Sequence, residues 1–163
     1  MADQTYSDQG TAPHVTLRFL AAPNDINRGG KVHGGIVMRW IEEAAHVLAT
    51  RWTDSQRNVA VYSGGIGFYR PIFIGDIVEV EACLLHTGSS SMHISVHVRS
   101  GDPRQQQLLV TTHCLTVFVA LNDEGQTIPC PPWNPTTMED LDLNAHALAL
   151  VSGLGMRPPP SQP

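Results

Sequence analysis

The sequence predicts one α+β domain in which a long apolar helix lies against a single antiparallel sheet. A strand-like run comes first, a helical segment follows it, and four more strand-like runs complete the pattern. The connecting segments are rich in Gly, Pro, Asn and Asp, which favour turns. A helix that is apolar nearly all round must be covered, and a sheet that curls about it provides that cover.

Each element follows from its own pattern. The helix is expected from Gly35 to about Arg51, because apolar residues recur there at three- and four-residue spacing. Its shared face holds Val37, Met38, Ile41, Ala44, Ala45 and Leu48. The run from Ser91 to Arg99 alternates apolar and polar side chains, as a half-buried strand does. The expected strands are 14–20, 58–69, 77–85, 91–99 and 107–121.

The expected domain covers residues 14–130. Residues 1–13 are expected to be a flexible leader, and residues 131–163 a Pro-rich tail that carries a short helix near 137–150. The end of that tail, 156–163, has a composition typical of disorder.

Composition and charge exclude several classes of function. The net charge of −5 and the lack of a basic run disfavour nucleic acid. No stretch approaches the ~20 apolar residues of a membrane span, and the polar N-terminus lacks the apolar core of a signal peptide. The eight histidines are scattered without the paired spacing of a metal site. Three cysteines without such spacing, two of them inside strand-like runs, favour a reducing cytoplasm.

Five segments in order along the chain form a recognisable set. The first two are Asn27–Gly35 and Trp40–Ala45, and the later three are Phe68–Asp76, Thr87–Ser91 and Phe118–Gly125. Together they resemble the cytosolic acyl-CoA thioester hydrolases of the hotdog superfamily. The resemblance covers roughly residues 14–130.

This resemblance implies a hotdog fold, in which a long central helix is wrapped by a five-stranded antiparallel sheet. It implies a homodimer at least, with further assembly into tetramers or hexamers, and active sites at the dimer interface. The implied reaction is hydrolysis of acyl-CoA to a free acid and coenzyme A. No separate cofactor is expected, since coenzyme A is part of the substrate.

The junction between loop and helix is the expected oxyanion site. Gly34 and Gly35 stand where backbone N–H groups lack helical partners and where the helix dipole is positive. A thioester oxygen can approach glycine closely, and Gly35 is the favoured donor. The alternative is that the glycines only relieve crowding. His33 is expected to support substrate binding, although a role as general base stays open.

The expected catalytic carboxylate is Glu42, as general base or nucleophile. A helical projection places it at the apolar boundary, where partial burial would raise its reactivity. Its spacing after His33 also resembles that of the carboxylate in phenylacetyl-CoA-type thioesterases. The alternative is a boundary charge paired with His46. Glu43 falls on the polar face, within reach of Arg39 four residues earlier.

Lys31 departs from the family pattern, because the closer relatives carry Asp or Asn there and use it in catalysis. Three interpretations stay open. Catalysis has moved to Glu42, or Lys31 pairs with Glu42 or Glu43 across the interface and tunes the pKa of that carboxyl, or the protein is a weak or inactive hydrolase that only binds acyl-CoA. Asn27 and Asp25 are candidates to position a water molecule. Asp25 is the second-choice base, with turn formation as its alternative role.

Arg70 is expected to bind the coenzyme A part of the substrate, because a guanidinium forms paired hydrogen bonds with phosphate groups. The turn of Gly88, Ser89, Ser90 and Ser91 offers hydroxyl and backbone donors, although an ordinary hairpin turn has the same composition. A thioesterase is therefore the first hypothesis, and a non-catalytic acyl-CoA-binding protein on the same fold is the second. A hydratase or dehydratase of the same fold resembles the sequence less.

Overall fold

The computed structural model describes residues 13–153, which form two α-helices, one short 3-10 helix and five strands. The strands are β1 (His14–Leu20), β2 (Asn58–Phe68), β3 (Ile77–Thr87), β4 (Ser91–Gly101) and β5 (Leu109–Ala120). The helices are η1 (Pro23–Asp25), α1 (Gly34–Thr53) and α2 (Met138–Gly153).

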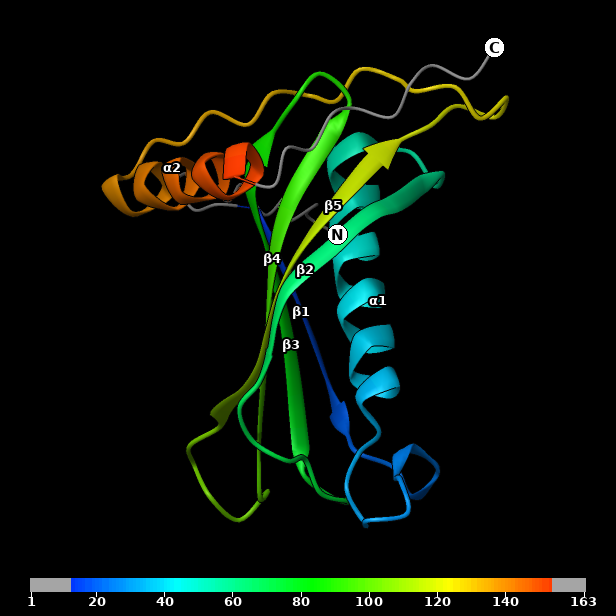
Figure 1. Cartoon of the computed structure of the whole chain (residues 1–163), viewed down its shortest axis with the longest axis vertical. Coiled ribbons are helices and arrows are strands. Elements are labelled where there is room, and N and C mark those ends of the chain that lie inside the picture. Colours follow the sequence, from blue (N-terminus) through cyan, green and yellow to red (C-terminus); the bar gives the residue numbers. More distant parts are fainter. Residues whose placement is uncertain (1–12, 154–163) are drawn as a thin grey trace, which may run out of the picture.

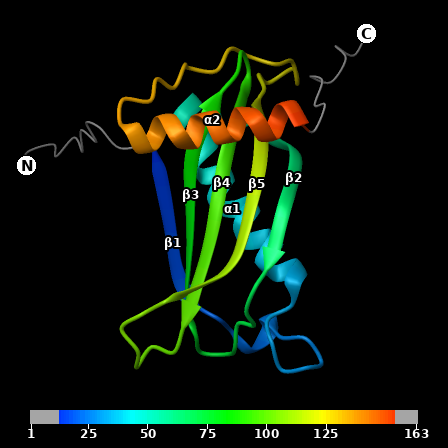
Figure 2. The ribbon, with the colours of Figure 1, turned by 60° about the vertical axis from the view of Figure 1, so that its left-hand side comes forward.

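The five strands form one antiparallel sheet in the order β1-β3-β4-β5-β2. Helix α1 runs along one face and contacts all five strands, whereas α2 crosses the opposite face near one end of the sheet (Figures 1 and 2). The predicted fold class, with a long helix against a five-stranded antiparallel sheet, is confirmed.

The core lies between α1 and the sheet. Four alternating residues of β4 are fully buried there, namely Met92, Ile94, Val96 and Val98. On α1, Ala44, Ala45 and Ala49 are also fully buried. Because alanine side chains are short, the helix backbone can approach the strands closely, and larger residues such as Ile41 fill the space on either side.

Helix α1 begins on a capping side chain and ends on a residue in the left-handed conformation. His33 is the N-cap, and its Nδ1 accepts the Gly35 N–H at 3.0 Å. Asp54 ends the helix in the left-handed conformation, with φ of 53°. The helix is therefore one residue longer at its start and two at its end than its apolar pattern predicts.

The second helix covers part of the outer face of the sheet. Its Ala147 is buried against Leu85 and Leu115, and the Asn144 side-chain amide donates to the Leu85 carbonyl at 2.9 Å. The predicted leader lies outside the described residues except for Pro13, and so does the predicted disorder over 156–163. Neither helix of the described chain is long and apolar enough to cross a membrane.

His93, on the outer face of β4, should make the fold sensitive to acid. Burial, with a smaller effect of the neighbouring His86, lowers the pKa of His93 from 6.5 to about 4. Because the unfolded chain then binds a proton at a higher pH than the folded chain, stability should fall as the pH falls from about 6.5 towards 4. Urea midpoints measured across this range check the slope.

The matched variant is His93→Gln, which cannot titrate. It should show a smaller loss of stability over the same pH range than the wild-type protein. Equal slopes for the two proteins would mean that the acid sensitivity originates elsewhere.

Candidate active site

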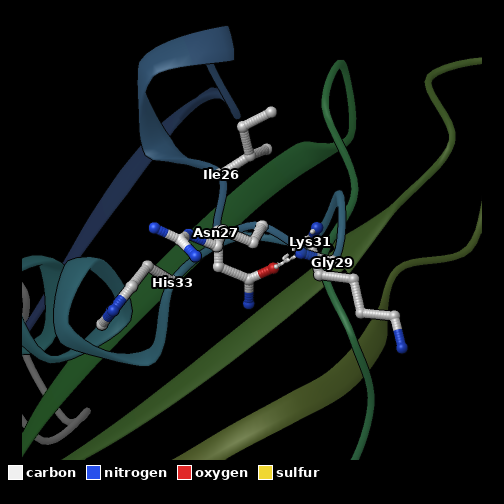
Figure 3. Close-up of a pocket in the computed structure, with 6 residues that line it drawn as sticks. Ile26, Asn27, Gly29, Lys31 and His33 are labelled. Atoms are coloured by element: carbon white, nitrogen blue, oxygen red, sulfur yellow. Dashed lines mark hydrogen bonds between the residues drawn. The ribbon is translucent and has the colours of Figure 1, made fainter.

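The loop before α1 is held by its own side chains. Asn27 Oδ1 accepts the N–H groups of Gly29 at 2.8 Å and Lys31 at 3.4 Å, as Figure 3 shows. Asp25 Oδ2 accepts the Ala22 N–H at 2.9 Å, which is the turn-forming role that its position in the loop suggested. The backbone of the loop is thereby fixed at the entrance to the helix.

The glycine pair stands at the first turn of α1. Gly34 is the first helical residue, so its N–H has no acceptor within the helix. The Gly35 N–H donates to the ring of His33, whose side chain is exposed. A thioester oxygen that accepts from Gly35 must therefore displace the His33 ring.

Two adjacent pockets open at this junction. The larger, of about 720 Å³, is lined by Ile26, Asn27, Arg28, Gly29, Lys31 and His33. The other, of about 420 Å³, lies between the loop and the β2–β3 connection. It is lined by Asn27, Lys31, Val32, Gly34, Val37, Phe68, Tyr69, Arg70, Pro71, Ile72 and Thr112. Asn27 and Lys31 form walls of both pockets, and Gly34 and Arg70 share the second.

The pockets are cationic. Arg28, Lys31 and Arg70 line them, and no Asp or Glu does. Within residues 13–153, none of these three side chains forms an ion pair. The site therefore favours a negatively charged ligand or negative charge that develops during a reaction.

The two helix glutamates differ in their contacts. Glu43 pairs with Arg39 at 3.5 Å, as their spacing predicted. Glu42 is exposed and forms no ion pair with any described residue, so the alternative pairing with His46 is absent. The predicted partial burial of Glu42 is wrong for the single chain, because no neighbouring element covers this part of the helix surface.

Within one chain, Glu42 cannot meet a thioester held by Gly35. Glu42 follows Gly35 by seven positions, which is about two helical turns, so the two residues share a face of the helix but stand roughly 10 Å apart along its axis. A base must come within about 3 Å of the proton that it removes, directly or through one water. A site that uses both residues therefore needs two copies of the chain.

The structure also separates the predicted substrate-binding residues. The β3–β4 turn holds Gly88, Ser89, Ser90 and Ser91, with the Gly88 N–H donating to the Ser91 carbonyl at 2.8 Å. It lies at the opposite end of the sheet from the start of α1 (Figure 1). Strand β3 spans this separation, which is on the order of 35 Å for its 11 residues.

Sequence reasoning missed Thr112 as a member of the site. This residue is buried on β5, pairs with Phe68 of β2 and lines the smaller pocket. Its strand was predicted, but nothing in the sequence relates that part of β5 to the glycine pair. The cysteines take no part, and burial, aided by Glu81 and nearby acids of α2, raises the pKa of Cys83 to about 11.

Comparisons with known proteins agree with this architecture. A family model described as the thioesterase superfamily matches residues 29–107. An uncharacterized acyl-CoA thioester hydrolase of Haemophilus influenzae is 32% identical over 142 residues, covering 85% of this chain and 87% of that protein. The crystal structure of an apo-hexameric acyl-CoA thioesterase superposes with a TM-score of 0.82 at 28% identity, covering 87% of this chain and 90% of the other.

A further solved relative was crystallised with ligands. The acyl-CoA hydrolase of Staphylococcus aureus, in complex with butyryl coenzyme A and coenzyme A, gives a TM-score of 0.80 at 26% identity, covering 88% of this chain and 87% of that one. The fold and these similarities identify a hotdog thioesterase. The chain belongs to the acyl-CoA thioester hydrolase family within that superfamily.

Proposed function

We propose that this protein hydrolyses acyl-CoA to a free acid and coenzyme A, in an active site built from two copies of the chain. The observation that carries the proposal is the arrangement along α1. Donors for an oxyanion stand at its first turn, and an exposed carboxylate stands two turns further on. One copy supplies the glycine pair, and the other supplies Glu42.

The glycine pair stabilises the developing negative charge. The thioester oxygen replaces the His33 ring as acceptor of the Gly35 N–H and lies close to the Gly34 N–H. The positive end of the helix dipole adds to this effect. Such preorganised donors are among the largest contributions to acyl-transfer catalysis.

The partner subunit's Glu42 acts as general base on a water molecule. The Glu42 carboxylate takes a proton from the water molecule while the oxygen of the water forms a bond to the carbonyl carbon of the thioester. The carbon–sulfur bond then breaks, and the coenzyme A thiolate takes the proton back from the protonated Glu42, which restores the carboxylate. Asn27 supports this step, because its Oδ1 is committed to the loop and its Nδ2 is left to donate to the attacking oxygen.

The exposed edge of β2 supports a homodimer. Val59, Val61, Ile66 and Phe68 are between 39% and 56% exposed along this strand, which is an edge of the sheet. A long apolar edge strand readily pairs with another strand. Pairing of two β2 strands would join the sheets and cover this surface, and the similarity to a hexameric thioesterase suggests further assembly of the dimers.

The coenzyme A end of the substrate is assigned to Arg70 and to the Gly88–Ser91 turn. Arg70 lines the pocket that contains Gly34, which is too close to the thioester for the phosphates, and the turn lies at the far end of the sheet. Both would therefore have to come from a copy other than the one that holds the thioester. A cytoplasmic location is inferred from the three free cysteines, Cys83, Cys114 and Cys130.

Thiol release tests the proposal. The purified protein should release free coenzyme A from acyl-CoAs of several chain lengths, as followed with a thiol-reactive dye. The second candidate, a non-catalytic acyl-CoA-binding protein, is favoured by the cation at Lys31. Acyl-CoA binding without thiol release would establish that candidate and contradict the hydrolase.

A further inference from the structure

We propose that the loop of residues 26–33 forms a subsite for a negatively charged substituent on the acyl group, namely the terminal carboxylate of an acyl chain. The protein would then prefer thioesters of dicarboxylic acids over those of simple fatty acids. The inference rests on the proposed function for the position of the thioester.

The larger pocket carries positive charge. Arg28 and Lys31 line it without a compensating Asp or Glu. Their side chains are exposed and form no ion pair among the residues that the structure describes. Both cations are thus available to a ligand, and each can form a charge-assisted hydrogen bond with a carboxylate.

Asn27 adds a hydrogen-bond donor to the wall of this pocket. Its Oδ1 accepts two backbone N–H groups of the loop, which fixes the orientation of the amide. The side-chain NH₂ group then points away from these bonds, as the close-up in Figure 3 shows. This NH₂ group has two N–H bonds, so one can donate to the attacking water and the other to a carboxylate in the pocket, which is the chemistry of an anion-binding site.

The subsite lies next to the expected position of the thioester. Lys31 and Asn27 also line the smaller pocket, which contains Gly34. Lys31 stands three positions before Gly34, so their Cα atoms are at most roughly 10 Å apart. In coenzyme A, two amide units and the carbons between them separate the sulfur from the nearest phosphate. A carbonyl held at Gly34 therefore places the acyl chain, rather than the phosphates, within reach of Lys31.

Binding of non-hydrolysable ligands tests the subsite independently of catalysis. The probes are two coenzyme A thioethers of matched length, one with a carboxypentyl chain and one with a hexyl chain. Calorimetry should give a Kd about tenfold lower for the carboxypentyl ligand, the ratio that a difference of about 1.4 kcal/mol produces. In Lys31→Met this preference should disappear, while the Kd of the hexyl ligand changes less than about twofold.

Arg39→Met is the matched control. Arg39 is an exposed cation on α1 that pairs with Glu43 and lines neither pocket, so its removal should leave the preference intact. The pair of probes also separates the two sources of negative charge, because both carry the same phosphates and only one carries a carboxylate. If Lys31→Met weakens the two ligands by the same factor, the loop binds a coenzyme A phosphate and the proposal is wrong.

Equal Kd values for the two thioethers in the wild-type protein would also overturn the subsite. Failure of the proposed function looks different, because it appears as absent thiol release while the carboxylate preference in binding persists. Lys31→Met should fold normally, since its side chain is exposed and its backbone bridge to Phe73 does not depend on the side chain.

Discussion

Replacing Glu42 by Gln should abolish thioester hydrolysis, with kcat lower by roughly a hundredfold to ten-thousandfold. The amide cannot take a proton from water, yet it has nearly the same size as the carboxylate. Because Glu42 is exposed and forms no ion pair with the described residues, folding should be unaffected. Steady-state kinetics with a saturating acyl-CoA measure the effect, and circular dichroism checks the fold.

Glu43→Gln is the control, since it makes the same chemical change one residue away. Glu43 pairs with Arg39 on the exposed helix surface, and an exposed pair of this kind contributes only about 0.3–0.5 kcal/mol to stability. Loss of this ion pair in Glu43→Gln should leave kcat nearly unchanged. An inactive Glu43→Gln beside an active Glu42→Gln would refute the assignment of the base.

Phe118→Ala should cause a large loss of stability. Phe118 lies on β5 in the core that α1 covers, and only 1% of its surface is exposed. Truncating a buried phenylalanine removes its contacts and leaves a cavity, which costs about 3–5 kcal/mol. For a chain of this length, Tm should fall by on the order of 10 °C, as measured by differential scanning calorimetry.

Phe118→Leu provides the comparison, because leucine keeps most of the apolar volume. Its effect should be well below that of the alanine variant. If Phe118→Ala lowered the free energy of unfolding by less than about 1 kcal/mol, the core would be packed differently from the one described.

The main elements of the fold could be predicted because each has a simple period. In β4 the alternation of apolar and polar residues matches the two faces of the sheet, and the apolar set from Met92 to Val98 is buried as the pattern indicates. In α1 the apolar spacing identified the helix face that meets the sheet. Both patterns reflect contacts within one chain, which the sequence of that chain encodes directly.

The position of α2 across the outer face was not predictable in the same way. Its sequence indicated a short amphipathic helix, yet apolar residues stand on several sides of it, and Leu141, Leu148 and Leu150 are exposed. Its buried contact depends on Ala147, a small residue that gives little signal in a periodicity analysis.

The site was harder to predict because its parts are related in three dimensions only. A helical projection placed Glu42 at an apolar boundary, whereas the single chain leaves it exposed. His33 could be a base or a cap from its sequence alone, and its bond to the Gly35 N–H shows that it caps the helix. Likewise, the Gly88–Ser91 turn and Arg70 belong to opposite ends of the sheet, which their order in the sequence does not reveal.

The central claim is that one active site takes its glycine pair from one chain and Glu42 from the other. Coexpression of two inactive variants tests it: Glu42→Gln, which lacks the base, and Gly35→Pro, which lacks an oxyanion donor at a first-turn position where proline is tolerated. A mixed dimer of these chains would contain one site with both defects and one intact site.

Mixed dimers should therefore recover roughly a quarter of the wild-type sites, because random pairing makes half of the dimers mixed and each symmetric pair holds two sites. Thiol release from acyl-CoA by the copurified variants measures this recovery, with each variant alone as the reference. Activity near that fraction is the predicted result. No recovery from verified mixed dimers would contradict a site shared between two chains.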